Sequence, residues 1–239
     1  MANLFPRWSN WLPLKLLVCI IVIANAVTAG FWYYFTPKYT RVGYMPVQPV
    51  PFSHNIHATQ LGMDCRYCHS FVEVAAHSNV PNTQVCMNCH TQVQKDNPKL
   101  AAVRESWKTG LPVDWVQIHK TPGYAYFNHS VHVNRGVSCF SCHGELNKMD
   151  VVYEKKPLSM GWCLECHRAP ENNLRPRDQV FNLNWTPADE NPQKFIAKYG
   201  PLPDAGSAIP AKLTQLQIGG VLKHDWNVRP PTDCAGCHR

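Results

Sequence analysis

The hydrophobic residues of this chain form one long uninterrupted run, at residues 16–35, and only short groups elsewhere. Twenty residues without a charge are enough to cross a bilayer once as a helix, and the aromatic residues 31–35 at the end of the run are typical of a membrane interface. A cleaved signal peptide is the alternative, but its apolar region is usually shorter than this one. We therefore predict a short cytoplasmic N-terminus and a retained transmembrane signal-anchor in residues 1–36.

After this run, proline and polar residues break the hydrophobic pattern into short pieces. The chain contains 20 prolines and only 16% charged residues, a composition that indicates short helices joined by extended loops. Residues 37–51 hold four prolines and predict a semi-rigid tether that keeps the chain close above the membrane, while residues 100–107 are expected to form one or two helical turns. Residues 169–233 are too long for an ordinary loop and predict an extended arm.

Five copies of the motif Cys-x-x-Cys-His account for ten of the eleven cysteines. This spacing is the attachment signature of c-type haem, in which two thiols add to the porphyrin vinyl groups and the His binds the iron as proximal ligand. The attachment cysteines are Cys65, Cys68, Cys86, Cys89, Cys139, Cys142, Cys163, Cys166, Cys234 and Cys237, and the proximal ligands are His69, His90, His143, His167 and His238. The sequence therefore predicts five covalently bound haem c groups.

Other sites also use paired cysteines. A lone Cys-x-x-Cys is compatible with a zinc site, a redox dithiol or a structural disulfide. Here every pair is followed directly by His, which neither a zinc ribbon nor a disulfide requires. The haem interpretation is therefore strongly favoured.

Seven His residues lie outside the motifs, and four of them belong to a repeat. Phe-Ser-His-Asn-Ile-His at residues 52–57 recurs as Phe-Asn-His-Ser-Val-His at residues 127–132, a shift of 75 residues, and the haem motifs that follow shift by 74 and 77 residues. This pattern indicates an internal duplication of a two-haem module. Two His residues three positions apart share one face of a helical turn. The predicted distal ligands are His54, His57, His129 and His132.

The distal ligand of the remaining haem stays open. The leading candidates are His77 and His119, followed by His224, Met149 and Met160. A Met ligand would raise the potential of its haem, whereas packing in a small core is the more ordinary role of Met. Because candidate ligands outnumber the haems, we expect six-coordinate, low-spin haems, which favour electron transfer over catalysis at an open iron.

The expected fold class is mainly irregular with short α-helices, a duplicated two-haem module and one transmembrane helix. Its segments are the N-terminus and signal-anchor (1–36), a tether (37–51), a first two-haem module with its connector (52–123), a second two-haem module (124–168) and an extended proline-rich arm ending in the fifth haem motif (169–239). The net charge of +7 does not indicate nucleic-acid binding. The propionates of five haems would add about ten negative charges, and no nucleic-acid motif is present.

The positive charges that flank the apolar run are balanced, so they do not set its orientation. Haem is attached to c-type motifs outside the cytoplasmic membrane, in the compartment of secreted thiols. We therefore expect a single-pass protein of the bacterial cytoplasmic (inner) membrane whose haem domain lies on the periplasmic side.

The motifs resemble those of two groups of multihaem cytochromes. Phe-x-His-x-x-His followed by Cys-x-x-Cys-His resembles the class III cytochromes c3 and c7, in which closely packed haems are wrapped by little regular structure. A closer resemblance, over about residues 52–168, is carried by Pro-Phe-Ser-His-Asn-Ile-His, Leu-Gly-Met-Asp-Cys-Arg-Tyr-Cys-His-Ser and Leu-Ser-Met-Gly-Trp-Cys-Leu-Glu-Cys-His-Arg. These segments look like the pentahaem cytochrome subunit of alternative complex III.

That resemblance implies an electron-transfer subunit, not an enzyme by itself, within a quinol-oxidising respiratory complex. The implied partners are a large iron-sulfur subunit similar to molybdopterin oxidoreductases, polytopic quinol-binding membrane subunits, and a monohaem cytochrome c or terminal oxidase. A similar subunit occurs in the menaquinol reductase complex of sulfate reducers, so the acceptor stays open. The alternatives are a stand-alone single-anchor quinol dehydrogenase that feeds periplasmic reductases and, less favoured, a multihaem reductase of a small nitrogen or sulfur oxyanion. The sequence identifies no catalytic residues.

Overall fold

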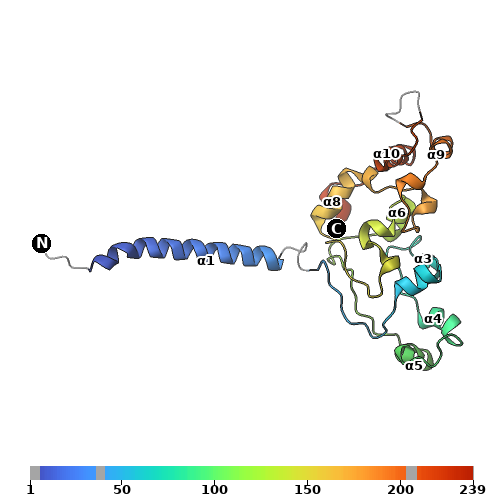
Figure 1. The fold of residues 1–239 in the computed structure, drawn as a ribbon, viewed down its shortest axis with the longest axis horizontal. Coiled ribbons are helices and arrows are strands. Elements are labelled where there is room, and N and C mark those ends of the chain that lie inside the picture. The colour runs from blue at the N-terminus through green and yellow to red at the C-terminus, as the bar shows by residue number, and fades with distance from the viewer. Residues whose placement is uncertain (1–5, 36–40, 203–208, 239) are drawn as a thin grey trace.

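The structure is a computed structural model that describes residues 6–35, 41–202 and 209–238. Its longest element is helix α1 (Leu12–Phe35), which follows the short 3-10 helix η1 (Arg7–Trp11). No residue of α1 is buried, and the helix lies apart from the rest of the chain (Figure 1). Its 24 residues extend over about 36 Å, compared with a hydrocarbon thickness of about 30 Å. Among the described helices, this one is long and apolar enough to cross a membrane.

The rest of the chain consists of short helices and irregular segments (Figure 1). The α-helices are α3 (Cys65–Cys68), α4 (Thr83–His90), α5 (Ala101–Thr109), α6 (His129–Asn134), α7 (Cys139–His143), α8 (Met160–Arg168), α9 (Pro192–Tyr199), α10 (Gln215–Asp225) and α11 (Cys234–Cys237). The shorter turns are η2 (Asn55–Gln60), η3 (Pro98–Leu100), η4 (Leu146–Lys148), η5 (Pro170–Asn172), η6 (Arg177–Gln179) and η7 (Pro187–Asp189). The described residues form isolated bridges but no strand. The helix predicted near residues 100–107 is confirmed as α5.

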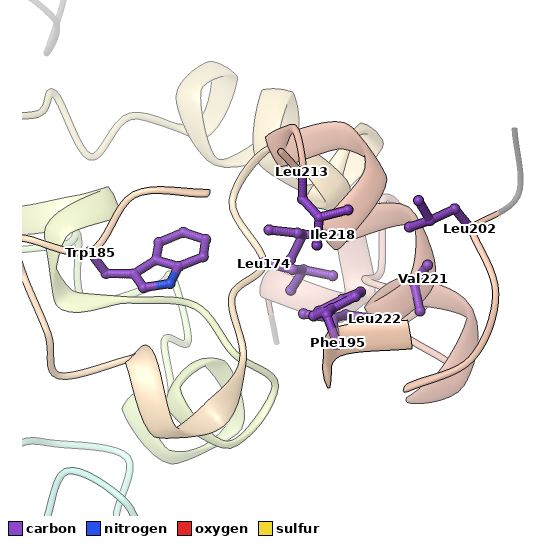
Figure 2. Close-up of a cluster of buried hydrophobic side chains, with 8 residues drawn as sticks. All are labelled: Leu174, Trp185, Phe195, Leu202, Leu213, Ile218, Val221 and Leu222. Atoms are coloured by element: carbon purple, nitrogen blue, oxygen red, sulfur yellow. The ribbon is translucent and has the colours of Figure 1, made fainter. Parts of the chain in front are cut away.

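The largest hydrophobic core lies after residue 169, where the sequence predicts an extended arm. The side chains drawn in Figure 2 form this core, and they are Leu174, Trp185, Phe195, Leu202, Leu213, Ile218, Val221 and Leu222. The segment differs from the prediction partly because three of its prolines start helical turns instead of breaking them. Pro192 lies in the first turn of α9, and Pro170 and Pro187 start η5 and η7, positions where the missing N–H costs nothing.

Helix α10 packs closely on η5, the turn that follows the helix of the fourth haem motif. Thr214 and Gln217 form a capping box that fixes where α10 begins. A Cβ atom at Gly219 would lie only 2.6 Å from the carbonyl carbon of Glu171, so the backbones of α10 and η5 are in direct contact. Gln215 donates from Nε2 to the carbonyls of Glu171, at 3.1 Å, and Leu174, at 2.8 Å.

The tether predicted at residues 37–51 is bonded to distant parts of the chain at several points, whereas residues 36–40 lie outside the described residues. Both backbone polar groups of Glu154 bond to it, the carbonyl accepting at 2.8 Å and the N–H donating at 3.1 Å. The side chain of Gln48 makes hydrogen bonds of 2.8 and 2.9 Å with the backbone of Val116. Residues 41–51, called the strap below, are therefore anchored to the chain at these points.

The second His-containing turn is held by the first haem module. The N–H of His129 donates to the carbonyl of Ala76 at 3.0 Å, and the N–H of Ser130 donates to the carbonyl of Ala75 at 3.2 Å. These carbonyls belong to the loop that follows the first haem motif. The second pair of candidate ligands is therefore positioned by a segment more than 50 residues earlier in the chain.

The first His-containing turn is held in the reciprocal way by the second module. The N–H of Asn55 donates to the carbonyl of Met149 at 3.1 Å, and the hydroxyl of Ser53 donates to the carboxylate of Asp150 at 2.7 Å. The two supporting loops correspond under the 74-residue shift of the duplication. The modules are therefore interlocked, each supporting the other's ligand turn.

Candidate haem-binding site

Each attachment motif lies in a helical turn whose N-terminus is capped by a side chain. The caps of α3, α4, α7, α8 and α11 are Asp64, Asn82, Ser138, Ser159 and Asp233, each of which accepts a hydrogen bond from a backbone N–H. Capping fixes where the turn begins. The turn then brings the two cysteines and the His, at positions i, i+3 and i+4, to one face. One porphyrin can therefore meet all three side chains of a motif.

Cysteines of different motifs lie close together. Four cysteines show this through their pKa, which burial raises in each case. The next cause of the raised pKa is a thiol of another motif: Cys86 for Cys68, Cys65 for Cys139, Cys166 for Cys142 and Cys237 for Cys163. These thiols link the first motif electrostatically with the second and the third, the third with the fourth, and the fourth with the fifth. None of these cysteines forms a disulfide in the described structure.

Most of the predicted ligands present the correct imidazole nitrogen. Their Nδ1–H groups donate to backbone carbonyls in the pairs His57–Ser53 (2.8 Å), His69–Asn79 (2.6 Å), His90–Val93 (2.9 Å), His129–Ala76 (2.9 Å), His132–Asn128 (2.7 Å), His167–Pro231 (2.7 Å) and His238–Tyr124 (3.2 Å). A proton on Nδ1 leaves the lone pair on Nε2 free for a metal. These seven side chains are therefore oriented as iron ligands.

Two pairs of imidazoles lie at the separation that an iron between them requires. The ring centres of His57 and His90 are 6.3 Å apart, and those of His132 and His167 are 6.1 Å apart. A metal bonded at about 2 Å to one nitrogen of each ring would hold the ring centres about 6 Å apart. The residues present thus fit two bis-His haems.

The same aromatic contact supports the distal ligand of each pair. Phe52 stacks on His57 with ring centres 4.4 Å apart, and Phe127 stacks on His132 at 4.6 Å. The planes differ by 23° and 29°, respectively. The sequence repeat is therefore also a repeat of side-chain geometry.

His54 and His129, the first His of each turn, lie near the proximal ligand His69. Burial, followed by the charges of His69 and His57, lowers the pKa of His54 to about 4. Burial is also the largest cause of the lowered pKa of His129, to which His77 and His69 contribute. Both imidazoles are therefore neutral at neutral pH and can offer a lone pair to iron. Nδ1 of His54 is buried without a hydrogen-bond partner in the described structure.

His119 lies against His143, the proximal ligand of the third motif. Their ring centres are 4.3 Å apart and the rings meet edge to face, so an iron between them requires the rings to separate by about 2 Å. Nε2 of His119 is buried and makes no hydrogen bond within the described residues. Burial, and then the charge of Arg41, lowers the pKa of His119 to about 4. The side chain is thus a neutral imidazole with a free nitrogen beside a haem-attachment motif.

The other candidates for the remaining ligand lie in less suitable places. His77 and His224 are exposed, and the side chain of Met160 is 62% exposed. Met149 is buried, at 7% exposure, but it lies beside the first His-containing turn, which already supplies two imidazoles. Among the predicted alternatives, the structure brings His119 to a motif most directly.

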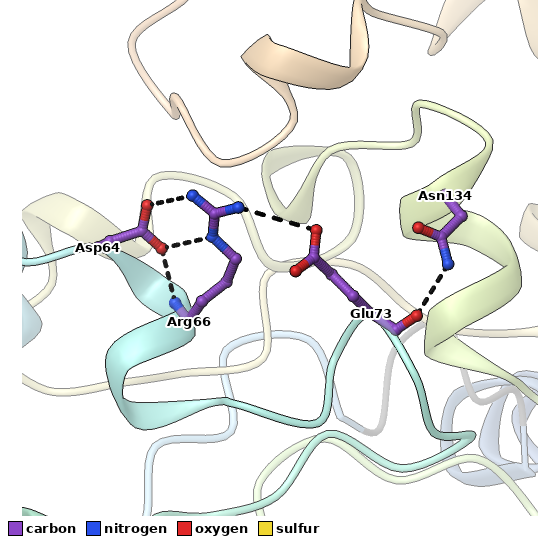
Figure 3. A network of polar contacts seen from close by, with 4 residues as sticks. All are labelled: Asp64, Arg66, Glu73 and Asn134. Atoms are coloured by element: carbon purple, nitrogen blue, oxygen red, sulfur yellow. Dashed lines mark hydrogen bonds and ion pairs between the residues drawn. The ribbon is translucent and has the colours of Figure 1, made fainter.

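A polar network joins the first attachment motif to the second His-containing turn (Figure 3). Arg66 bonds to the carboxylate of Asp64 through Nε at 2.9 Å and Nη2 at 2.8 Å, and it faces Glu73 at 3.8 Å. Asn134 donates to the backbone carbonyl of Glu73 at 2.8 Å. The hydrogen bonds from Arg66 lower the pKa of Asp64. These charges are about half exposed, so their role is geometric and not a large source of stability.

Several supporting residues were not identified from the sequence. The capping side chains have a readable signal, because Asp, Asn or Ser stands one or four positions before each motif. The ion pair of Arg41 with the buried Glu154 has no such signal, because its partners are far apart in the chain. Most of the carbonyls that orient the imidazoles are likewise distant in sequence.

Comparisons with known proteins agree with this site. Residues 50–106 match the family described as cytochrome c7 and related cytochrome c. The chain is 29% identical, over 170 residues, to the multiheme cytochrome c subunit of menaquinone reductase from Nitratidesulfovibrio vulgaris, covering 62% of this chain and 79% of that protein. It is 27% identical, over 189 residues, to cytochrome c-552 of Maridesulfovibrio salexigens, covering 59% of this chain and 37% of that protein.

The matched family segment contains the first His-containing turn and the first two attachment motifs. Covalently bound haem c is the cofactor that this family implies, and the residues described above fit it. The chain is therefore homologous to multihaem cytochromes c and carries a cytochrome c7-like segment over residues 50–106.

Proposed function

We propose that this chain is a membrane-anchored cytochrome with five haem c groups that carries electrons within a quinol-oxidising respiratory complex of the alternative complex III type. The observation that supports this most directly is the orientation of the imidazoles. Seven predicted ligands hold Nδ1 on a backbone carbonyl and leave Nε2 free. Iron with two such ligands has no position open for a substrate, so the chain transfers electrons and carries out no reaction by itself.

Haem c supplies a one-electron carrier when it is bound. The residues of the chain hold, orient and shield that group. The electrostatic links between thiols of the first and second, first and third, third and fourth, and fourth and fifth motifs support a continuous path through all five haems. The interlocked modules keep these distances fixed.

The proposed location is the bacterial inner membrane, with α1 as a single-pass anchor and the haem domain on the periplasmic side. The proposed partners are an iron-sulfur subunit similar to molybdopterin oxidoreductases, polytopic quinol-binding subunits, and a monohaem cytochrome c or terminal oxidase. Support for a membrane complex comes from α1 and from the similar subunit of menaquinone reductase.

The direction of electron flow is a separate part of the proposal. The name of the similar complex refers to menaquinone reduction, whereas the motif resemblance favours quinol oxidation. A chain of bis-His haems conducts both ways, and its partners' potentials set the direction. We propose oxidation because the resemblance to the alternative complex III subunit extends over both modules.

Purification of the native complex tests this function. We expect an N-terminally tagged chain, extracted from native membranes in mild detergent, to co-purify with an iron-sulfur subunit and polytopic subunits and to show quinol:cytochrome c activity. A haem-loaded chain that emerged alone and still oxidised quinol would instead identify a stand-alone quinol dehydrogenase. Quinone reduction without quinol oxidation would reverse the proposed direction.

The proposal also assigns the remaining distal ligand to His119. We expect His119→Ala to change one haem per chain from low-spin to high-spin, because a buried neutral imidazole beside His143 is lost. His77→Ala is the matched comparison, since His77 is exposed and is expected to leave the haems low-spin. Electron paramagnetic resonance of the purified protein measures both. The reverse pattern would assign the ligand to His77.

A further inference from the structure

The strap that follows the membrane anchor begins, at its first described residue, with an ion pair between the partly exposed Arg41 and a buried carboxylate. Glu154 is completely buried, and its Oε2 accepts a hydrogen bond from Nε of Arg41 at 2.9 Å. Its other oxygen, Oε1, has no hydrogen-bond partner among the described residues. Removing the carboxylate of Glu154 from water is costly, and Arg41 stays 35% exposed, so this pair indicates a geometric role more readily than a gain in stability.

Arg41 extends this ion pair to the segment that carries His119. Its Nη2 donates to the backbone carbonyl of Ile118, the residue directly before His119. One guanidinium therefore bridges a buried carboxylate and the peptide next to a candidate ligand. Because the guanidinium is planar with fixed donor directions, it sets the position of this peptide relative to Glu154.

The same segment is fixed at a second point. The side chain of Gln48 makes hydrogen bonds with both the N–H and the carbonyl of Val116. The carbonyl and the N–H of Glu154 also bond to the strap, at the N–H of Gly43 and the carbonyl of Tyr44. Val116 and Ile118, which lie three residues and one residue before His119, are therefore both held by the strap. His119 itself donates no ring N–H to a carbonyl in the described structure, unlike the seven ligands discussed above, so its position depends on this backbone support.

We propose that Arg41, held in place by Glu154, is a positioning residue that presents the imidazole of His119 to the haem attached through Cys139 and Cys142. This inference rests on the proposed function, in which His119 is the distal ligand of that haem. It adds that the strap leading from the membrane anchor controls the coordination of one particular haem.

The test compares variants of the pair in the haem-loaded, full-length protein within its complex. Arg41→Met removes the charge and both hydrogen bonds, and we expect it to change up to one of the five haems from low-spin to high-spin. Arg41→Lys keeps the charge but has no fork to span both acceptors, so an intermediate loss is expected. Glu154→Gln keeps the shape of the side chain and is expected to produce a smaller loss in the same direction. Spin state is measured by electron paramagnetic resonance, and carbon monoxide binding reports the opened iron.

Added imidazole separates positioning from general damage. If the haem pocket is intact and only His119 is displaced, imidazole from solution is expected to restore the low-spin signal of Arg41→Met. The matched control is Glu171→Gln, which weakens an ion pair of similar length with Lys223 (2.8 Å) that touches no predicted ligand. The number of low-spin haems in this control is expected to equal that of the unmodified protein.

The outcomes distinguish this inference from the function on which it rests. If His119→Ala produces a high-spin haem while Arg41→Met, Arg41→Lys and Glu154→Gln remain fully low-spin, the positioning role is wrong and the ligand assignment stands. If His119→Ala itself remains fully low-spin, the ligand assignment fails first. Should Arg41→Met yield no haem-loaded protein, Arg41→Lys and Glu154→Gln decide, and an unchanged spin state in both would overturn the proposal.

Discussion

Replacing His57 or His132 by alanine is expected to leave one of the five haem irons without its distal ligand. Each imidazole faces a proximal ligand across the distance that an iron fills, 6.3 Å for His57 and His90 and 6.1 Å for His132 and His167. Loss of the distal ligand leaves a five-coordinate iron, which is high-spin and binds carbon monoxide. Each variant is expected to bind about one carbon monoxide per chain, and the double variant about two.

The matched control for these variants is His224→Ala, because His224 is exposed and its imidazole makes no ring contact with a proximal ligand among the described residues. It is expected to bind no carbon monoxide. His57→Met and His132→Met provide a second measurement, since a Met ligand keeps the iron six-coordinate but raises its potential. Redox titration would then show one haem shifted upward in each variant. If His57→Ala and His132→Ala both remained low-spin, the paired-imidazole assignment would be untenable.

The chemistry of the haem sites could be predicted from the sequence because it is local. Two thiols and a His within five residues lie on one helical face whatever surrounds them. The same reasoning applies to His54 and His57, whose three-residue spacing is repeated at His129 and His132. Such patterns depend on the helical turn alone.

The supports of these ligands could not be predicted, because they come from distant parts of the chain. The carbonyl of Ala76 orients His129, and the carbonyl of Pro231 orients His167. Every residue carries a carbonyl, so the sequence holds no signal for which one accepts. The same applies to Arg41, whose partners Glu154 and Ile118 are distant in sequence and can be identified only from the folded structure.

The interlocking of the two modules has a physical consequence that the repeat alone does not reveal. The duplication implies two similar units in sequence, yet each His-containing turn is held by the other unit. Neither module can therefore position its ligands alone. A rigid arrangement of this kind suits a carrier, because electron transfer between haems depends on fixed distances and orientations.

The second prediction of large effect concerns the hydrophobic core formed after residue 169. Gly219→Ala is expected to destabilise the protein by about 1–3 kcal/mol or more, the range for inserting atoms into a packed site. The added Cβ would lie 2.6 and 2.7 Å from the backbone C and Cα of Glu171, and backbone cannot rotate away as a side chain can. For a chain of this size that loss lowers Tm by roughly 2–12 °C, measured by thermal unfolding of the haem-loaded protein.

The adjacent residue, Gly220, supplies the control, and its replacement is expected to change the stability in the opposite direction. A Cβ at Gly220 meets nothing within 4 Å, so Gly220→Ala adds helix propensity worth up to about 1 kcal/mol without a clash. It is therefore expected to leave Tm unchanged or raise it, although both glycines lie in the same helix. Equal effects of the two substitutions would show that α10 does not rest on η5. A lower Tm in Gly219→Ala alone would show that this backbone contact stabilises the hydrophobic core that lies, in sequence, between the fourth and fifth attachment motifs.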